Sequence, residues 1–368
     1  MKILILQDQL RSGGTERHSI LLSREFAALG HGGELVVFRP GGRLAASAPA
    51  HQVLQPFDTG LDWLAPGLTR AALGGAPDIV LCMGKTANCF AGPLQGRART
   101  RGLATRVVAT LRAGDRLPWF YYASVRRAAH LVANSHEAAT ELVNNHGLDR
   151  GHVSVIHNSL VFPEGGAPRD EALRARLGAG PGTTVLLNVA MFRPSKNQRD
   201  LLKIAAGLPK GWDWRLWLVG DGVERRVCER LATALGISDR VSFLGFQQDP
   251  APYYRAADIA VHASREEALS NFLIEAQSHG LPVVACKALG ISECFVRGRT
   301  GWVVPQGDPA AFRAALATLA DDTPATRAQR AAEARRFAQR AFDPQVQVRA
   351  YIGLFKTLVR DTLPASAL

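Results

Sequence analysis

The sequence predicts an α/β protein of two doubly wound domains, each with a parallel β-sheet covered by helices on both faces. Short, continuously apolar runs alternate with amphipathic segments through both halves of the 368-residue chain. Such runs are typical of parallel strands that are buried on both faces, and their alternation with helices favours Rossmann-like domains. The segment 162–180 between the halves is rich in glycine, proline and charged residues, as a linker is expected to be.

The first half of the chain predicts a domain at 1–165. Its strands are expected at 2–6, 34–38, 78–83, 106–111, 130–134 and 153–157. Its helices are expected at about 15–29, 121–129 and 137–145. Ligands of such sheets bind at the carboxyl ends of the strands, so we look for chemistry just after each apolar run.

The second half predicts another domain at 166–344, which faces the first across a central cleft. Its strands are expected at 184–190, 214–220, 240–245, 258–263, 282–286 and 301–305. Helical patterns intervene at 196–206, 224–235, 270–279 and 308–320. The last helical pattern, 345–360, is followed by no strand, and we expect residues 345–368 to pack back onto the N-terminal domain.

Composition narrows the class of protein. Hydrophobic residues make up 47% and charged residues 21% of the chain, a balance typical of globular domains. No stretch approaches the roughly 20 apolar residues that span a bilayer. The first residues also lack the pattern of a signal peptide, so we expect a cytoplasmic protein.

The five cysteines are scattered without a C-x-x-C pair, which argues against a disulfide framework and a zinc site.

The chain has a formal net charge of +12, and a protein this basic is expected to approach polyanions. Arginines crowd two stretches, namely Arg97, Arg99, Arg101, Arg106, Arg112, Arg116, Arg126 and Arg127, and then Arg327, Arg330, Arg335, Arg336 and Arg340. One interpretation is a pair of solvated faces. The other is a surface on the N-terminal half that contacts an anionic membrane or acceptor, with the runs GRARTR (96–101) and SVRR (124–127) at its centre.

The strongest signal is the segment SREEALSNFLIEAQSHGLPVVA, residues 264–285. Glu267 falls in the loop after the strand 258–263, and Glu275 falls inside the next helix. Ser270 is a natural N-cap for that helix. The backbone N–H groups of Leu269, Ser270 and Asn271 would then favour an anion at the strand ends. The alternative is an ordinary amphipathic helix that carries two surface acids.

This segment resembles the donor-site signature of retaining GT-B glycosyltransferases of family 4, the group 1 type. EALSNFLIEA followed by GLPVVA matches the family's two acids and its GxPVV strand. Similar motifs are VANS, VIHN, LVGDG, VSFLG, AADIAVHAS and GRTGWVV, at 132–135, 155–158, 218–222, 241–245, 256–264 and 298–304. The likeness covers most of the chain and is densest from about 185 to 305.

The resemblance implies the GT-B fold, a nucleotide-sugar donor and a particular role for each of these residues. Glu275 would hold the ribose, and Glu267 would contact the donor sugar. The N–H groups from Leu269 to Asn271 would reach the distal phosphate. The loop near Phe246 would meet the base through its main chain. Gly220, within LVGDG, is assigned to the donor site on the same grounds.

A second signal is NVAMFRPSKNQRDLL (188–202), a strand followed by a basic loop and a helix. Fixed cations there would stabilise the charge that develops on a diphosphate leaving group. Lys196 stands where the family keeps its phosphate lysine. The usual family arginine is replaced by Met191, and Arg193 is the candidate that reaches back to supply the guanidinium. The alternative is a set of solvated basic residues at a helix start.

Three weaker signals lie in the first half. Gly13 and Gly14, in SGGTERH (12–18), precede the first long helix, and in the family this loop meets the donor diphosphate. A glycine pair is also a common tight connection. Arg112 follows the strand 106–111 where relatives often place a histidine, and it would hold an anionic acceptor or the sugar, or else is a plain surface arginine. Lys85 and Asn88 are further acceptor-side candidates.

The family resemblance, together with these signals, implies a retaining, hexosyltransferase-type glycosyltransferase. No Asp-x-Asp motif occurs, and His18, His136, His262 and His279 lack metal-ligand spacing, so we expect neither a metal nor a cofactor. The donor would be UDP- or GDP-linked, and the acceptor a saccharide or a lipid-linked saccharide of lipopolysaccharide or other envelope polymers. A peripheral position on the cytoplasmic face of the inner membrane follows from the charge.

Two alternative functions remain from the sequence. A UDP-sugar 2-epimerase has the same two-domain architecture, although it needs acid and base groups that the N-terminal strand ends do not supply. A basic nucleic-acid-binding protein is allowed by charge alone, but no recognition module is present.

Overall fold

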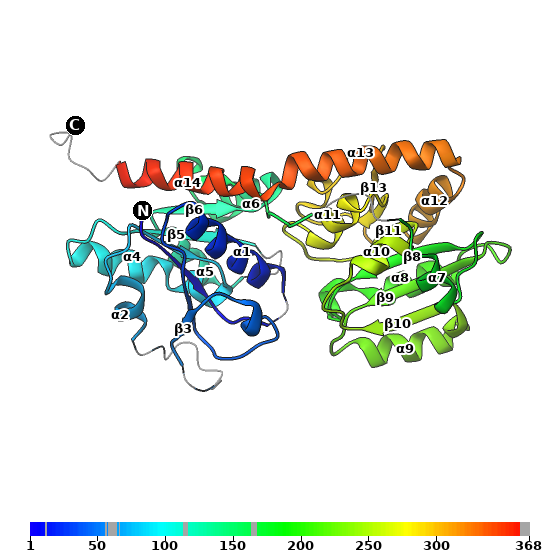
Figure 1. The fold of residues 1–368 in the computed structure, drawn as a ribbon, viewed down its shortest axis with the longest axis horizontal. Helices are drawn as coiled ribbons and strands as arrows, with labels where there is room; N and C mark the ends of the chain where they lie inside the picture. Colours follow the sequence, from blue (N-terminus) through cyan, green and yellow to red (C-terminus); the bar gives the residue numbers. More distant parts are fainter. Residues whose placement is uncertain are drawn as a thin grey trace. The chain divides into compact units, whose positions relative to one another are not determined.

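The computed structural model describes residues 1–11, 13–55, 57, 65, 67–112, 117–162 and 168–360. The chain divides into two compact units, one formed by Met1–Ser159 together with Pro344–Leu368 and the other by Leu160–Asp343. Each unit is a parallel β-sheet with helices on both faces (Figure 1). The predicted fold class, two Rossmann-like α/β domains, is therefore confirmed.

Within its described residues, the first unit contains a seven-stranded parallel sheet in the order β3-β2-β1-β4-β5-β6-β7. The strands are β1 (Ile3–Gln7), β2 (Glu34–Val37), β3 (His51–Val53), β4 (Ile79–Cys82), β5 (Arg106–Leu111), β6 (His130–Ala133) and β7 (Val153–Val155). Its helices are α1 (Gly14–Ala28), α2 (Leu68–Leu73), α3 (Lys85–Cys89), α4 (Ala91–Thr100), α5 (Trp119–Val125), α6 (His136–His146) and α14 (Pro344–Arg360).

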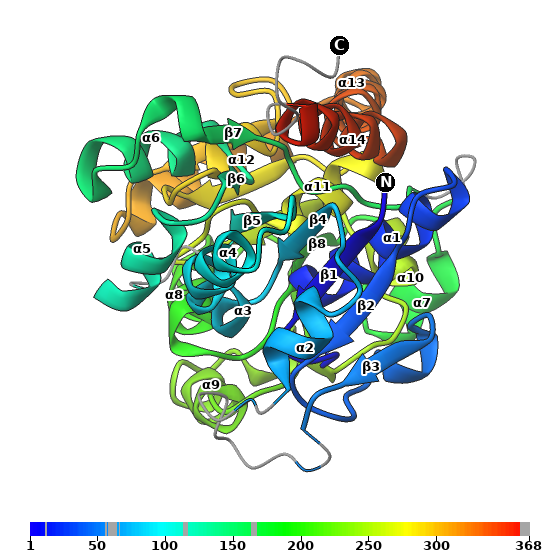
Figure 2. The ribbon, with the colours of Figure 1, turned by 90° about the vertical axis from the view of Figure 1, so that its left-hand side faces the viewer.

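The last helix, α14, belongs to the first unit although it comes from the other end of the chain. It lies beside α1 on one face of the sheet (Figure 2). Its apolar side, with Tyr351 and Phe355, packs against Phe26 of α1 and against the strands. Helix α14 is amphipathic, and it buries its apolar side by covering this face of the sheet.

Within its described residues, the second unit contains a six-stranded parallel sheet in the order β10-β9-β8-β11-β12-β13. The strands are β8 (Thr184–Val189), β9 (Trp214–Val219), β10 (Val241–Gly245), β11 (Ile259–His262), β12 (Val283–Cys286) and β13 (Gly301–Val304). Its helices are α7 (Glu171–Arg176), α8 (Gln198–Ala206), α9 (Arg225–Ala234), α10 (Ala251–Ala256), α11 (Asn271–Ser278), α12 (Pro309–Ala320) and α13 (Pro324–Phe342).

The division between the units falls between Ser159 and Leu160, earlier than the 165/166 boundary placed by the sequence analysis. The reason is that Leu160 and Phe162 pack against the core of the second unit. The Leu160 N–H also donates to the Phe342 carbonyl at 3.4 Å. Apolar residues in the linker thus extend the second unit at its N-terminal end.

The second arginine cluster lies on α13, a 19-residue helix. Several of its members make contacts within the second unit and are not simply solvated. Arg330 forms an ion pair with Asp322 at 2.7 Å and stacks on Trp302. Arg335 donates to the His279 carbonyl at 3.4 Å. Among the described helices, none combines the length and the apolar character that crossing a bilayer requires.

Candidate functional site

The order of the second sheet places two loops side by side. Strand β8 is followed along the chain by β9 on one side, whereas β11 pairs with β8 on the other side and continues to β12. The chain thus changes direction between β8 and β11, and ligands of open α/β sheets bind at the carboxyl ends of strands at such a point. The loops after these two strands carry Lys196 and Glu267.

The loop after β8 is held in one conformation by its own polar groups. A short 3₁₀ turn, Pro194–Lys196, leads into Asn197, whose backbone is left-handed with φ of 53°. The Asn197 side chain donates to Asp200 at 2.6 Å and to the Ala263 carbonyl at 3.3 Å. Asparagine tolerates this conformation better than most residues. The turn therefore presents Lys196 from a fixed position.

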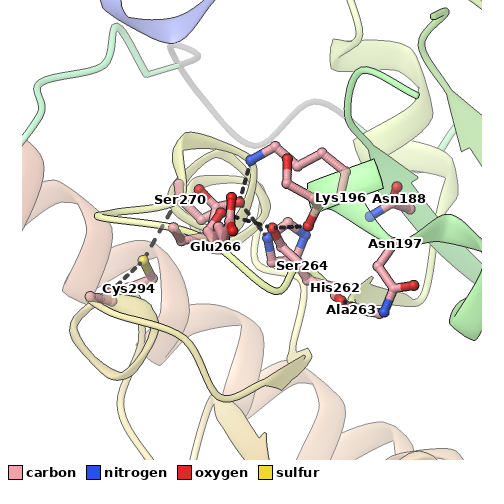
Figure 3. Close-up of polar contacts among 12 residues, drawn as sticks. Asn188, Lys196, Asn197, His262, Ala263, Ser264, Glu266, Ser270 and Cys294 are labelled. Atoms are coloured by element: carbon pink, nitrogen blue, oxygen red, sulfur yellow. Dashed lines mark hydrogen bonds and ion pairs between the residues drawn. The ribbon is translucent and has the colours of Figure 1, made fainter. Parts of the chain in front are cut away.

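The loop after β11 is tied directly to the loop after β8. The Ser264 hydroxyl and the Arg265 N–H both donate to the Ser195 carbonyl, at 3.1 and 2.8 Å (Figure 3). Ser264 itself is fully buried. Two donors on one carbonyl hold the loops as a unit, so Lys196 and Glu267 meet although 71 residues separate them in the chain.

Lys196, Glu267 and His262 form a compact charged cluster. The Lys196 Nζ donates to Glu267 Oε1 at 2.5 Å, and His262 Nε2 lies 2.9 Å from the same oxygen. Burial alone would raise the pKa of Glu267, but the Lys196 ammonium and the His262 hydrogen bond lower it to about 2. Glu267 is therefore an ionised, hydrogen-bond-accepting carboxylate at neutral pH.

His262 is a site residue that the sequence analysis missed. It is the last residue of β11 and is 1% exposed. Since the carboxylate of Glu267 only accepts hydrogen bonds, Nε2 must carry the hydrogen. The other ring nitrogen, Nδ1, is buried without a partner among the described residues. Metal-ligand spacing does not reveal this residue. The signal in the sequence is a polar residue that ends an apolar strand, five positions before an acid.

The helix start predicted at Ser270 is present, with one difference. Ser270 occupies the N-cap position of α11 and is 4% exposed, but its side chain makes no capping hydrogen bond. Its carbonyl accepts from Ile274 N–H at 3.2 Å and from the Cys294 thiol at 3.8 Å (Figure 3). Leu269 beside it is buried in the core. The first turn of α11, beginning at Asn271, is thus anchored through its backbone.

Glu275 lies one turn into α11 and is oriented by Tyr254, a second residue that the sequence analysis missed. The Tyr254 hydroxyl donates to Glu275 Oε2 at 2.6 Å. The Tyr254 ring is buried and stacks on His279, with centroids 5.0 Å apart and planes at 5°. Burial, with a smaller effect of Arg255, lowers the pKa of His279 to about 4. The ring of His279 is therefore uncharged at neutral pH where Tyr254 packs on it.

Both units match known protein domains. Residues 183–322 match the family described as Glycosyl transferases group 1, and residues 12–160 match Glycosyltransferase Family 4. D-inositol 3-phosphate glycosyltransferase 2 of Catenulispora acidiphila is 36% identical over 209 residues, which are 54% of this chain and 49% of that protein. The lipopolysaccharide core biosynthesis glycosyltransferase LpsE of Rhizobium meliloti is 37% identical over 150 residues, or 40% and 43% of the two chains.

The solved structures agree with these matches at the level of the fold. HepE of Anabaena, crystallised in complex with UDP, matches with a TM-score of 0.81 at 23% identity, covering 97% of this chain and 100% of its own. Each unit of this chain thus matches a glycosyltransferase domain family, and the fold is that of GT-B glycosyltransferases. It spans about half the length of the curated relatives that it matches.

Other residues of the GT-B donor site, as the sequence analysis assigned it, lie in the second unit. Arg193 is exposed, and its guanidinium has no ion pair among the described residues. Its carbonyl accepts the Lys196 N–H at 3.0 Å, so the two side chains leave the same turn. Phe246 follows β10 and is half-buried. The roles of Arg193 and Phe246 toward a donor stay predictions.

Gly220 lets the end of β9 approach the loop after β8 because it has no side chain. Its φ is 137°, and a Cβ at this position would lie 2.0 Å from the Ala190 carbonyl oxygen. Its N–H donates to the Gly245 carbonyl at 2.8 Å. The end of β9 therefore passes against the start of the loop that carries Lys196, at a distance that only glycine permits.

The glycine pair lies at the first helix of the first unit, as predicted. Gly13 is the N-cap of α1, and Gly14 is its first helical residue. A Cβ on Gly13 would lie 2.3 Å from an oxygen of Glu16, whose flexible side chain folds back over the helix start. The space next to this N-terminus is thus taken by an acidic side chain, and contact of Gly13 and Gly14 with a diphosphate stays a prediction.

Arg112 has partners that the sequence analysis did not foresee. Its guanidinium donates to Asn158 Oδ1 at 2.5 Å and to the Tyr351 hydroxyl. The interpretation of Arg112 as a plain surface arginine is therefore wrong. The side chain links the end of β5 to the segment after β7 and to α14, all within the first unit.

Asn88, offered as an acceptor-side candidate, is 2% exposed. Its amide donates to the Gly84 carbonyl at 2.7 Å, and its carbonyl accepts the Thr110 N–H at 2.8 Å. These bonds assign it to the framework that joins α3 to β5. Lys85 is the first residue of α3.

Proposed function

We propose that this protein is a retaining glycosyltransferase that moves a sugar from a nucleoside-diphosphate sugar to a saccharide or lipid-linked acceptor. The observation that carries the proposal is the cluster of Lys196, Glu267 and His262. It lies at the carboxyl ends of β8 and β11, where the strand order of the second sheet reverses. The cluster lies in the domain that matches Glycosyl transferases group 1. It supplies a cation for a leaving diphosphate and an ionised carboxylate for sugar hydroxyls.

Each group of the site has a part in this reaction. Lys196 would neutralise charge that grows on the diphosphate as the glycosidic bond breaks, a stabilisation that is strongest in the transition state. The N-terminus of α11 would face the distal phosphate. Glu267 would accept hydrogen bonds from the donor sugar, and Glu275, held by Tyr254, would accept those of the ribose.

Retention is proposed to occur by a front-side route, in which the leaving phosphate helps to deprotonate the acceptor hydroxyl. The site as described has cations and an ionised carboxylate of very low pKa, which is a poor general base. Time-resolved NMR of the anomeric proton in the first-formed product checks this. A product with inverted configuration would contradict the mechanism while leaving glycosyl transfer itself intact.

The donor is identified by a thermal-shift screen against UDP, GDP, ADP and their hexose conjugates. A ligand that binds only the folded protein raises its melting temperature, by an amount that grows with the ratio of concentration to Kd. HepE was solved with UDP, and we expect UDP or GDP to give the largest shift. Transfer is expected to continue in the presence of EDTA, because cationic side chains rather than a metal ion stabilise the diphosphate. Conversion of the donor sugar without any acceptor would instead indicate an epimerase.

The acceptor is proposed to belong to envelope polysaccharide assembly. The relative LpsE carries the name of a lipopolysaccharide core enzyme, and the inositol phosphate relatives also act, by their names, on a phosphorylated acceptor. An anionic acceptor agrees with the net charge of +12. Transfer of labelled sugar to lipopolysaccharide core fragments, with D-inositol 3-phosphate as a parallel arm, distinguishes the two classes.

Replacing Tyr254 with phenylalanine tests the proposed ribose contact. The change removes the hydrogen bond to Glu275 but keeps the ring that packs on His279. Hydrogen bonds to charged groups contribute about 1.5–3 kcal/mol, so we expect KM for the donor to rise roughly tenfold or more with kcat nearly unchanged. This pattern is expected because a ribose contact is the same in the ground and transition states.

Steady-state kinetics measure the split between KM and kcat, and Tyr253→Phe is the matched control on the same helix. Tyr253 is half-buried and lies next to Tyr254. Equal loss in both variants, or loss of kcat alone in Tyr254→Phe, would contradict the assignment.

A membrane-facing surface is proposed on α4 and α5 of the first unit. Arg97 and Arg99 on α4 are exposed, as are Arg126 and Arg127 directly after α5, and Trp119 at the start of α5 is 79% exposed. The Gly92 N–H donates to the Ser124 hydroxyl at 2.9 Å, so the two helices are adjacent. Arginines attract anionic lipid headgroups, and a tryptophan favours the membrane interface.

Reversing the charge of two of these residues, in Arg126→Glu/Arg127→Glu, is expected to weaken binding to anionic vesicles at least about tenfold, since each arginine near such a surface contributes about 1 kcal/mol. Co-sedimentation with vesicles of phosphatidylglycerol and phosphatidylethanolamine measures it. The control Arg336→Glu/Arg340→Glu changes net charge equally on exposed positions of α13. Equal loss in both variants would mean that only net charge matters.

A further inference from the structure

One oxygen of Glu267 accepts hydrogen bonds from two donors of different exposure. Lys196 and His262 both reach Oε1, at 2.5 and 2.9 Å. The His262 side chain is 1% exposed, whereas that of Lys196 is 24% exposed. The cluster is thus shielded from solvent at His262 and accessible at Lys196. A ligand would therefore reach it at Lys196.

The proposed function requires the Lys196 ammonium to bind a diphosphate, whereas in the free protein this ammonium is paired with Glu267. A cation already paired with a carboxylate at 2.5 Å is largely neutralised toward a second anion. A diphosphate that binds at Lys196 therefore competes with Glu267 for the ammonium. Glu267, in turn, cannot remain buried as an ion without a hydrogen-bond donor.

We propose that Glu267 is the resident counter-ion of Lys196, which the donor diphosphate displaces, and that His262 is the positioning residue that holds Glu267 when the lysine turns to the phosphate. This inference rests on the proposed function, because it takes Lys196 as the diphosphate ligand. It adds an exchange of partners that is coupled to donor binding. No covalent bond changes in the exchange.

His262 is suited to this role by its place in the fold. It ends β11, whose backbone pairs with β12 up to His262 itself. Its ring is packed at 5.6 Å from the ring of Phe272. The imidazole therefore stays where it is when the flexible lysine side chain moves, and its Nε2–H keeps the carboxylate ionised and pointing toward the donor sugar.

The first test uses the affinity for nucleoside diphosphate without a sugar, measured by calorimetry with UDP, and with GDP and ADP in parallel. In Glu267→Gln the competing charge is gone, and we expect binding to tighten about three- to tenfold, or up to about 1.4 kcal/mol. This direction is opposite to that expected for a residue that merely binds the ligand. Transfer from the complete donor should fall in the same variant, because the sugar loses its carboxylate.

The control for long-range charge effects is Glu266→Gln. Glu266 is the adjacent residue, carries the same charge and is exposed. Affinity in Glu267→Gln that is equal to or weaker than in Glu266→Gln would overturn the inference. If the wild-type protein bound none of the three nucleotides, the proposed function itself would fail, and the inference with it.

The second test separates positioning by His262 from simple support of the fold. His262→Met removes the N–H donor at similar size. Glu267 would then keep no donor once Lys196 turns to the diphosphate, so we expect both UDP affinity and kcat to fall at least about tenfold. His262→Gln restores an N–H in the ε position and should recover most of both. Parallel losses of kcat and UDP affinity in both variants, at melting temperatures lowered equally, would show a structural role only.

Discussion

Replacing Lys196 with methionine is expected to lower kcat/KM for the donor about 10²–10³-fold, which is the usual cost of removing one preorganised group that faces developing charge. The Lys196 side chain extends from a turn whose backbone is held by the Asn197 side chain and by the two hydrogen bonds to the Ser195 carbonyl. Once its side chain has turned to the diphosphate, this cation needs no further reorganisation when the leaving group becomes more negative. Both kcat and nucleoside-diphosphate affinity should fall, because the charge contacts the diphosphate in the ground state and stabilises it more strongly in the transition state.

The matched control is Lys203→Met, on the exposed side of α8 only a few residues away. It removes the same charge from the same region and should leave kcat/KM within about twofold. Because Lys196→Met also leaves Glu267 with one donor fewer, its melting temperature must be measured beside the kinetics. Full activity in a folded Lys196→Met protein would remove the lysine from the mechanism.

The framework of the fold was predictable because it follows from burial. Every strand predicted from a continuous apolar run is present, since a strand covered on both faces tolerates little else. The misses are elements whose signal is weaker. Strand β3 is three half-exposed or exposed residues at the sheet edge. Helix α13 buries small alanines such as Ala334 and Ala338, and its arginine-rich sequence concealed that apolar side.

The site was predictable where topology alone brings residues together. Lys196 and Glu267 follow neighbouring strands, so the rule for open sheets places them in contact. Partners that come from elsewhere could not be read from the pattern. Arg112 contacts Asn158 and Tyr351, which are 46 and 239 residues away in the chain. Tyr254 carries no periodic signal, and only its distance to Glu275 reveals what it does.

Gly220 shows how a motif residue can shape a loop through its backbone. In the sequence it is part of a predicted donor-binding segment, and the structure places it against the Ala190 carbonyl, where a Cβ would lie 2.0 Å away. Its neighbour Gly222 has the same character, since a Cβ there would lie 2.4 Å from the Phe192 carbonyl oxygen. Two glycines thus let the loop between β8 and the Lys196 turn pass close to the end of β9.

Replacing Gly220 with alanine is therefore expected to lower both stability and donor binding. The strained φ of 137° and the collision with backbone together should cost on the order of 2–4 kcal/mol of unfolding free energy. The loop that carries Lys196 is the part that must move to relieve the collision. Affinity for nucleoside diphosphate should then fall about tenfold or more in the molecules that remain folded. Denaturant unfolding and calorimetry measure the two effects separately.

Gly236→Ala is the control that separates strain from displacement of the site. Gly236 has a φ of 67°, so alanine is strained there too, but nothing lies within 4 Å of the added Cβ. This variant should lose about 1 kcal/mol of stability, the usual cost of a non-glycine residue in the left-handed region, and keep its nucleotide affinity. If Gly220→Ala behaved in the same way, the close approach to Ala190 would serve the fold alone. Loss of nucleotide affinity in Gly220→Ala only would show that this backbone contact sets the position of Lys196.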